Sequence, residues 1–156
     1  MILVAFTCKP KRFSVSVMPK GKTFDSDVMI DYIQMTGKRF RNLKKNKVQL
    51  SDLLWQMDNA RPHTSQATQD YLTRREVSLV KQSPYSPDLN LCDRYIFRIL
   101  KSELKQDSLI SQSEVQSAVQ RCFRRLSEDT LKDQLIKLRD HCQRVIEFAG
   151  DYISCK

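Results

Sequence analysis

Two aspartates, Asp58 and Asp93, occupy positions from which carboxylates commonly hold a divalent cation. Asp58 directly follows the apolar run 53–57, which predicts a buried strand that ends at this residue. Asp93 lies 35 positions later, near the start of a predicted helix. Ligand sites in open α/β sheets gather at the carboxyl ends of strands, where such side chains meet. Carboxylate oxygens suit Mg²⁺ or Mn²⁺, and a pair of such ions can activate water for phosphodiester cleavage.

Two further polar residues accompany these acids. His63 and Lys81 lie close enough in the sequence to help position phosphate groups. By composition alone this support for a metal site is weak, because any basic α/β protein has aspartates at strand ends. The alternative, a polar loop that leaves a core strand, stays open on these residues.

The residues around the two acids form longer motifs. Residues 58–64 are DNARPHT, and residues 83–89 are SPYSPDL, followed by Asp93 and the triplet YIF. Both motifs resemble those around the second and third catalytic aspartates of mariner-family transposases. The 34 residues between Asp58 and Asp93 also match the spacing of mariner enzymes, which end their acidic triad in aspartate rather than glutamate. Weaker similarity extends in both directions and covers nearly the whole chain.

This resemblance implies a ribonuclease-H-like fold whose acidic triad binds two divalent metals, Mg²⁺ or Mn²⁺, with DNA as the partner. The intact family cuts and rejoins DNA by phosphodiester hydrolysis and strand transfer. On this chain Asp58 corresponds to the second acid and Asp93 to the third. The residues expected to shape the site beside these acids are Asn59, Pro62, His63, Ser86, Pro87 and Asp88. Asp88 is expected to cap the helix that presents Asp93 rather than to bind metal.

The family's first aspartate has no counterpart in this sequence. In the family it lies on a strand before the hairpin that residues 2–18 predict here, and this chain starts with that hairpin. Asp25 and Asp27 are better explained as caps of the following helix. The helix-turn-helix region that such transposases use to recognise inverted repeats is also absent. We therefore expect a catalytic domain that is truncated at its N-terminus and inactive, because two-metal chemistry needs bridging geometry.

Three hypotheses about function remain open. The first is an inactive fragment of a transposase catalytic domain. The second is a non-catalytic DNA-binding or protein-interaction module derived from a transposase. The third is a working metal nuclease with an acid recruited from elsewhere, which needs a third carboxylate within about 5 Å of the other two. A homodimer is a candidate assembly, and neither a small-molecule cofactor nor a membrane partner is expected.

The elements that must position these residues follow from the periodicity of the apolar side chains. Residues 2–7 and 13–18 predict a hairpin, and the alternation in its second strand predicts that one face is buried. A helix is predicted from Asp25 or Ser26 to about Lys45.

The middle of the chain predicts a parallel pair of strands covered by a helix. The strands are the run 53–57 and residues 77–80, and the helix between them is predicted over 64–75. Ser86 is expected to cap the next helix, with Pro87 at its first position.

The last third of the chain predicts helices. Ser111 and Glu114 have the spacing of a capping box. A final helix is predicted over 131–148, and its inward residues are Leu135, Leu138, Cys142 and Val145. The predicted fold class is therefore α/β: a ribonuclease-H-like mixed sheet with flanking helices, lacking its first strand, plus C-terminal helices. We expect one partial domain over 1–156, with a ribonuclease-H-like portion, 1–105, and a helical portion, 106–156.

The net charge of +9 favours a polyanionic partner such as nucleic acid. The cations expected to face DNA phosphates cluster at the far end of the first predicted helix, with one more after the second strand pair: Lys38, Arg39, Arg41, Lys44, Lys45, Lys47 and Lys81. Five scattered cysteines without a Cys-x-x-Cys pair indicate neither a zinc site nor a disulfide framework. The N-terminal residues do not resemble a secretion signal, so we expect a nuclear protein, or a cytoplasmic one if untargeted.

Overall fold

The computed structural model describes residues 1–42, 48–106 and 111–150. In chain order its main elements are β1 (Ile2–Thr7), β2 (Arg12–Val17), α1 (Ser26–Arg41), β3 (Leu54–Gln56), α2 (Arg61–Thr64), α3 (Gln66–Arg74), β4 (Ser78–Val80), α4 (Phe97–Gln106), α5 (Gln112–Arg125) and α6 (Glu128–Glu147). Three short helical turns join them: η1 (Leu50–Asp52), η2 (Pro87–Leu89) and η3 (Cys92–Ile96). This mixture of helices and short strands agrees with the predicted α/β class.

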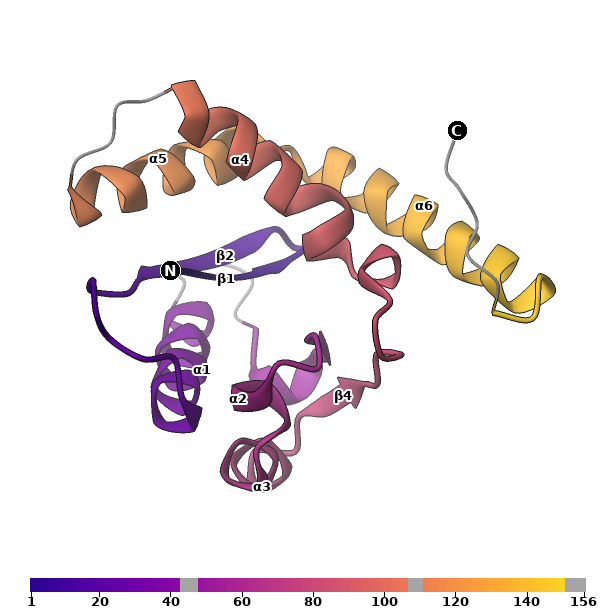
Figure 1. The fold of residues 1–156 in the computed structure, drawn as a ribbon, viewed down its shortest axis with the longest axis horizontal. Helices are drawn as coiled ribbons and strands as arrows, with labels where there is room; N and C mark the ends of the chain where they lie inside the picture. The colour runs from indigo at the N-terminus through magenta and orange to yellow at the C-terminus, as the bar shows by residue number, and fades with distance from the viewer. Residues whose placement is uncertain (43–47, 107–110, 151–156) are drawn as a thin grey trace.

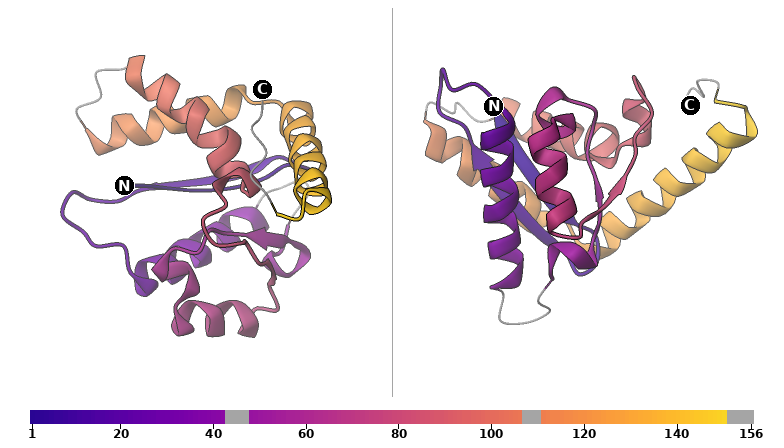
Figure 2. Two further views of the ribbon diagram at one scale, coloured as in Figure 1. Left: turned by 45° about the vertical axis from the view of Figure 1, so that its right-hand side comes forward. Right: turned by 90° about the horizontal axis from the view of Figure 1, so that it is seen from below.

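The β1–β2 hairpin forms the middle layer of the molecule. Its strands are antiparallel, as predicted, with α1 on one side and α4 and α5 on the other (Figures 1 and 2). Two neighbours on β2, Ser14 and Val15, point to opposite faces and are both buried. The prediction that only one face of β2 is buried is therefore wrong, because helices cover both faces.

Two hydrophobic clusters fill the spaces beside the hairpin. The first lies between the hairpin and the helices α4, α5 and α6, and its centre is the fully buried Phe123. The ring of Phe123 stacks on that of Phe13 with centroids 5.3 Å apart. The second cluster joins α1 and α3 around Ile33 and Leu72, with apolar side chains from both strand pairs packed against it. The first cluster combines residues from both predicted portions of the domain, whose division stays a prediction.

A second, separate pair of strands leads to the candidate site. β3 and β4 are parallel, as predicted, and α3 lies between them in sequence. However, Leu54 on β3 is 72% exposed, and β4 is the only strand paired with β3 in the described part of the chain. The prediction of a buried strand before Asp58 is therefore wrong, because β3 lies at a sheet edge.

The helix predicted over 64–75 is present as α3, and a short additional helix, α2, precedes it. The chain is extended at Ser65, which separates α2 from α3. The Ser65 hydroxyl accepts a hydrogen bond from the Thr68 N–H and so caps α3. The break gives α3 its own start immediately after the Asp58 loop.

The C-terminal helices begin where local signals place them. Ser111 and Glu114 form the predicted capping box of α5. Helix α6 begins at Glu128, earlier than predicted, and projects beyond the rest of the molecule (Figure 2). Leu138 is buried, but Leu135 is 46% exposed. The predicted inward position of Leu135 is therefore wrong, because no described element covers that side of α6. None of the helices in the described residues is long and apolar enough to cross a membrane.

Candidate functional site

Asp58 follows β3 and is oriented by its own loop. Its Oδ1 accepts hydrogen bonds from the Ala60 N–H at 3.0 Å and from Nδ1 of His63 at 2.6 Å. The His63 ring packs edge-on against Phe24, just before α1, with centroids 5.7 Å apart. Oδ2 of Asp58 has no hydrogen bond to another described residue. One carboxylate oxygen is therefore fixed, and the other is open to a cation.

Asp93 lies in the π-helical turn η3, which leads into α4. Partial burial raises the pKa of Asp93 above its ordinary value, and the negative charge of Asp58 raises it further, whereas Lys101 lowers it. The fold therefore brings the two predicted acids close enough to repel one another. A bound cation would relieve this repulsion.

Three amide side chains connect the segments that carry the two acids. Nε2 of Gln56, on β3, donates to the Leu89 carbonyl oxygen at 2.8 Å. Nδ2 of Asn90 donates to Oε1 of Gln82 at 2.8 Å, and Oδ1 of Asn90 accepts from the Cys92 N–H at 2.9 Å. Asn90 is only 5% exposed, so its amide anchors the turn that carries Asp93.

The structure gives the residues on the Asp58 side defined contacts. Nδ2 of Asn59 donates to the Gln82 carbonyl oxygen at 3.0 Å, and His63 bonds to Asp58 directly. Pro62 lies in the first turn of α2. These positions are consistent with a role in shaping the loop, which stays a prediction.

The predicted helix from Ser86 to Asp93 is broken. The Ser86 side chain makes no capping hydrogen bond, and Pro87 begins only the short 3₁₀ turn η2. The helical path starts again after Asn90, which bonds to the Cys92 N–H. Asparagine is among the preferred residues at helix starts, so this signal was present in the sequence, four positions after the residue we predicted as the cap.

Asp88 has a different partner from the one predicted. Its Oδ2 bonds to Nε2 of His141 at 2.7 Å, and His141, in α6, is fully buried. The predicted capping role is therefore wrong, because the carboxylate ties η2 to α6 instead. No local pattern could indicate this contact, since the two residues lie 53 positions apart.

The predicted DNA-facing cations on α1 lie away from the acids, whereas Lys81 follows the strand that pairs with β3 and so lies beside the segment that carries Asp58. The N-terminal end of α1 is next to His63, and Lys38 and Arg41 lie roughly 18–22 Å further along this helix. Arg39 lies over the Phe13 ring, 5.7 Å from its centroid. Lys81 is exposed directly after β4. The predicted cations outside the described residues are Lys44, Lys45 and Lys47.

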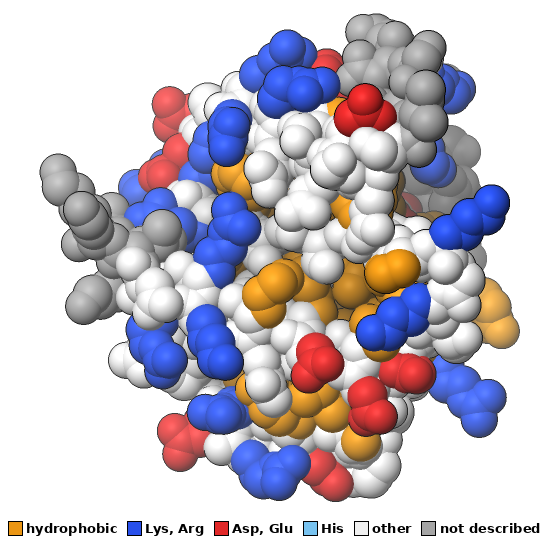
Figure 3. Space-filling view, turned by 90° about the vertical axis from the view of Figure 1, so that its left-hand side faces the viewer, with side chains coloured by type: hydrophobic (Ala, Val, Ile, Leu, Met, Phe, Trp, Pro, Cys, Tyr) orange, Lys and Arg blue, Asp and Glu red, His pale blue; other side chains and the backbone are white. Residues whose placement is uncertain are grey.

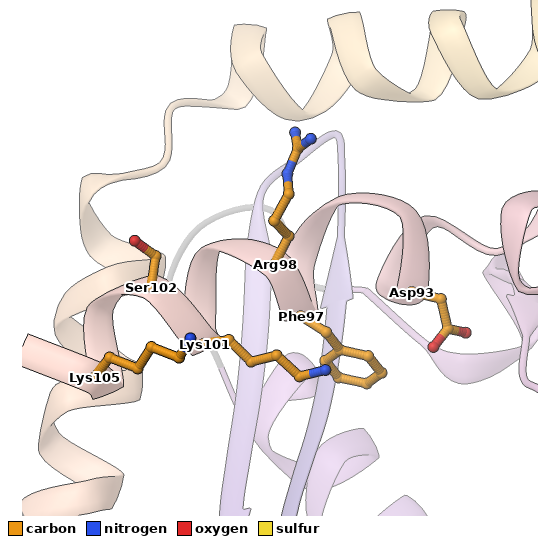
Figure 4. Close-up of a pocket in the computed structure, with 6 residues that line it drawn as sticks. All are labelled: Asp93, Phe97, Arg98, Lys101, Ser102 and Lys105. Atoms are coloured by element: carbon orange, nitrogen blue, oxygen red, sulfur yellow. The ribbon is translucent and has the colours of Figure 1, made fainter. Parts of the chain in front are cut away.

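A basic pocket that we did not predict lies beside Asp93 on α4 (Figure 4). Its volume is about 450 Å³, and its lining residues are Asp93, Phe97, Arg98, Lys101, Ser102 and Lys105. Asp93, Phe97, Lys101 and Lys105 follow one another at four-residue intervals and so share one face of the helix. Lys101 extends toward the side of Phe97 and Asp93 (Figure 4). Lys101 and Lys105 lie 8 and 12 positions after Asp93, and this helical spacing was visible in the sequence.

Comparison with known families identifies the kind of domain to which this site belongs. Residues 1–116 match the model of the DDE superfamily endonuclease family. The chain belongs to this family. The chain is also similar to the human histone-lysine N-methyltransferase SETMAR, with 25% identity over 137 residues. The match covers 88% of this chain and 20% of SETMAR, so this chain spans about a fifth of the length of that curated relative.

Several solved structures share the fold of this chain. The Mos1 transposase catalytic domain with raltegravir and manganese matches with a TM-score of 0.85 at 18% identity, over 98% of this chain and 76% of that one. A Mos1 paired-end complex with the left transposon end matches with a TM-score of 0.84 at 18% identity, over 98% of this chain and 44% of that one. These matches confirm the predicted ribonuclease-H-like fold and the resemblance to mariner transposases.

The two acids offer carboxylate oxygens that no hydrogen bond within the described residues occupies. Oδ2 of Asp58 is open, and the Asp93 carboxylate makes no hydrogen bond with another described residue. Hard carboxylate oxygens are what Mg²⁺ and Mn²⁺ prefer. However, no group of three or more His, Cys, Asp or Glu side chains suited to a metal ion is found in the described part of the chain. The pair therefore supplies only part of a two-metal site.

Cys92 lies next to Asp93 and is partly buried. Burial raises the pKa of its thiol to about 12, and the charges of Asp93 and Asp58 contribute to the shift. Metal binding needs the thiolate. Without a bound cation this thiol therefore stays protonated at neutral pH.

Proposed function

We propose that this chain is a mariner-type catalytic domain that binds DNA beside Asp58 and Asp93 without cleaving it. The observation that carries the proposal is the position of the acid pair next to the cationic pocket on α4. A metal-dependent DNA site needs two parts: acids that hold a cation, and basic side chains such as lysines that attract phosphates. The net charge of +9 adds a general attraction for polyanions.

Each part of the site has a defined role in this proposal. Asp58 and Asp93 hold Mg²⁺ or Mn²⁺, while His63 keeps the Asp58 carboxylate oriented. When bound, such an ion polarises a phosphodiester oxygen or a water molecule. Lys101 and Lys105 attract the phosphates of the strand that lies along α4. The Mos1 catalytic domain with magnesium or manganese, and Mos1 bound to a transposon end, support the same assignment of metal and partner here.

The lack of cleavage follows in this proposal from the number of ligand groups. Two carboxylates leave a cation pair under-coordinated, and the described residues offer no third group. Misplacing a reacting group by 1 Å can cost on the order of a hundredfold in rate. We further propose a nuclear location, because DNA is the partner. A homodimer and a protein-interaction role stay predictions.

DNA affinity tests the binding part of the proposal. Lys101→Gln combined with Lys105→Gln is expected to weaken duplex binding about tenfold and to lower the slope of log affinity against log salt by about 2, because each phosphate contact releases about one counterion. Fluorescence anisotropy over a salt series measures both quantities. The matched control combines Lys132→Gln with Arg144→Gln on the exposed surface of α6 and is expected to keep the wild-type slope. Equal slopes for the two variants would contradict the proposed site.

Nicking of supercoiled DNA tests the absence of cleavage. The wild-type chain and Asp58→Asn are expected to give the same background in Mn²⁺, because the acid pair does not assemble a complete metal site. Gel electrophoresis of the plasmid over time measures the nicked fraction. Nicking by the wild type that clearly exceeds that of Asp58→Asn would instead support the nuclease hypothesis.

A further inference from the structure

A second basic pocket lies at the far end of α1 from the acids. Its volume is about 340 Å³. Lys38 and Arg41 line it from the last turns of α1, and Arg74 and Arg75 line it from the end of α3. Four cations from two helices therefore converge on one concave surface.

The close approach of η1 to α1 closes one wall of this pocket. A Cβ atom at Gly37 would lie 2.9 Å from Cδ1 of Leu50, so the absence of a side chain at Gly37 allows the contact. Both residues line the pocket. The hollow is thus built by tertiary packing, not by exposed side chains alone.

The positive charge of this pocket gathers where two helices end. Cations suit helix C-termini, where carbonyl groups are exposed, and Lys38, Arg41 and Arg74 lie in the last turns of α1 and α3. None of the four cations forms an ion pair with another described residue, and Glu76 is the only acid that lines the pocket. Arg75 lies over the Tyr71 ring, 5.5 Å from its centroid. The pocket thus has a positive charge that its own surroundings do not neutralise.

This pocket is electrostatically independent of the acid site. Lys38 and Arg41 lie roughly 18–22 Å along α1 from the end that adjoins His63. This separation is more than twice the Debye length of about 8 Å at physiological ionic strength. Lys and Arg side chains also appear in both the upper and the lower part of the face in Figure 3. Phosphates bound at one surface are therefore largely screened from the other.

We propose that this pocket binds the backbone of a second DNA duplex, so that one chain contacts two DNA segments at once. The planar guanidinium groups of Arg41, Arg74 and Arg75 match the geometry of phosphate oxygens. Side-chain amides of Gln34 and Gln49 line the same pocket and add uncharged donors. Several cations spread over two helices suit a run of phosphates better than a single small anion. The inference goes beyond the proposed function and rests on it only for the first duplex.

Binding stoichiometry tests this inference. With excess duplex of about 12 base pairs, far below the persistence length of about 150 base pairs and so too stiff to wrap around the molecule, the wild-type chain is expected to bind two duplexes per chain. Lys38→Gln combined with Arg74→Gln is expected to bind one, and so is Lys101→Gln combined with Lys105→Gln. The control with Lys132→Gln and Arg144→Gln is expected to bind two. Native mass spectrometry counts the duplexes, and thermal unfolding checks that each variant folds.

The possible outcomes separate this inference from the proposed function. A wild-type chain that binds one duplex, unaffected by Lys38→Gln with Arg74→Gln, overturns the inference and leaves the α4 site intact. Binding of one duplex that is lost in that variant, but kept in Lys101→Gln with Lys105→Gln, overturns the proposed α4 site instead. A wild-type chain that binds no duplex overturns both.

Discussion

Phe123→Ala is expected to lower the free energy of unfolding by about 3–5 kcal/mol. Phe123 is fully buried, and its ring packs on Phe13 and Phe6 at centroid distances of 5.3 and 5.8 Å. Alanine removes these contacts and leaves a cavity between the hairpin and α5, where a close-packed interior cannot fully collapse. Such a loss is a large fraction of the stability of a typical domain, about 5–15 kcal/mol. Urea unfolding followed by circular dichroism measures the change.

Two companion variants make the Phe123 result specific. Phe148→Ala removes the same atoms from a side chain that is 60% exposed and is expected to change the stability by less than about 0.5 kcal/mol. Phe123→Leu keeps part of the volume and is expected to fall between the two. A loss for Phe123→Ala as small as that for Phe148→Ala would show that the hairpin and α5 do not share this core.

Lys11→Met is expected to lower the free energy of unfolding by about 2–3 kcal/mol. The Lys11 ammonium donates to the Phe123 and Leu126 carbonyl oxygens at the end of α5, and its backbone N–H donates to the Glu128 carboxylate at 2.8 Å. Methionine keeps the length of the side chain but removes its charge and its donors. The carbonyl groups at the end of α5 then lose charged hydrogen bonds in a partly buried position. Urea unfolding measures this loss as well.

The neighbouring lysine supplies the control for Lys11. Lys9 is exposed and belongs to the same turn, so Lys9→Met removes the same charge without the contacts to α5. Its expected change is within about 0.5 kcal/mol. Equal effects at the two positions would mean that Lys11 acts only through the net charge.

Much of the scaffold was predictable because its signals are local. The hairpin follows from two runs of strand-forming residues beside a short turn, and the capping box of Ser111 and Glu114 spans only four positions. The acid pair was predictable for another reason. Asp58 and Asp93 lie in long motifs at a characteristic separation, so their residue types and spacing predicted that they lie together, and the structure places them close enough to interact.

The wrong predictions concern surroundings that local signals do not describe. Leu54 has the composition of a buried strand, yet it lies on an exposed edge because β4 is its strand's only partner in the described residues. Leu135 fits the apolar face of α6, but no described element covers its side of the helix, although Leu138 and His141 further along are buried. Periodicity shows which side of an element is apolar, not whether another element covers it.

The sequence by itself determined the family and most of the regular elements, and it singled out the two acids as candidates, because these depend on motifs and on interactions between residues a few positions apart. Only the tertiary structure decided which cations accompany the acids and which lie at the far end of α1. It also paired Asp88 with His141 and Lys11 with the end of α5, across 53 and at least 112 positions of the chain. Such contacts arise when helices and strands pack, and packing depends on the shapes and charges of whole elements rather than on any short stretch of residues.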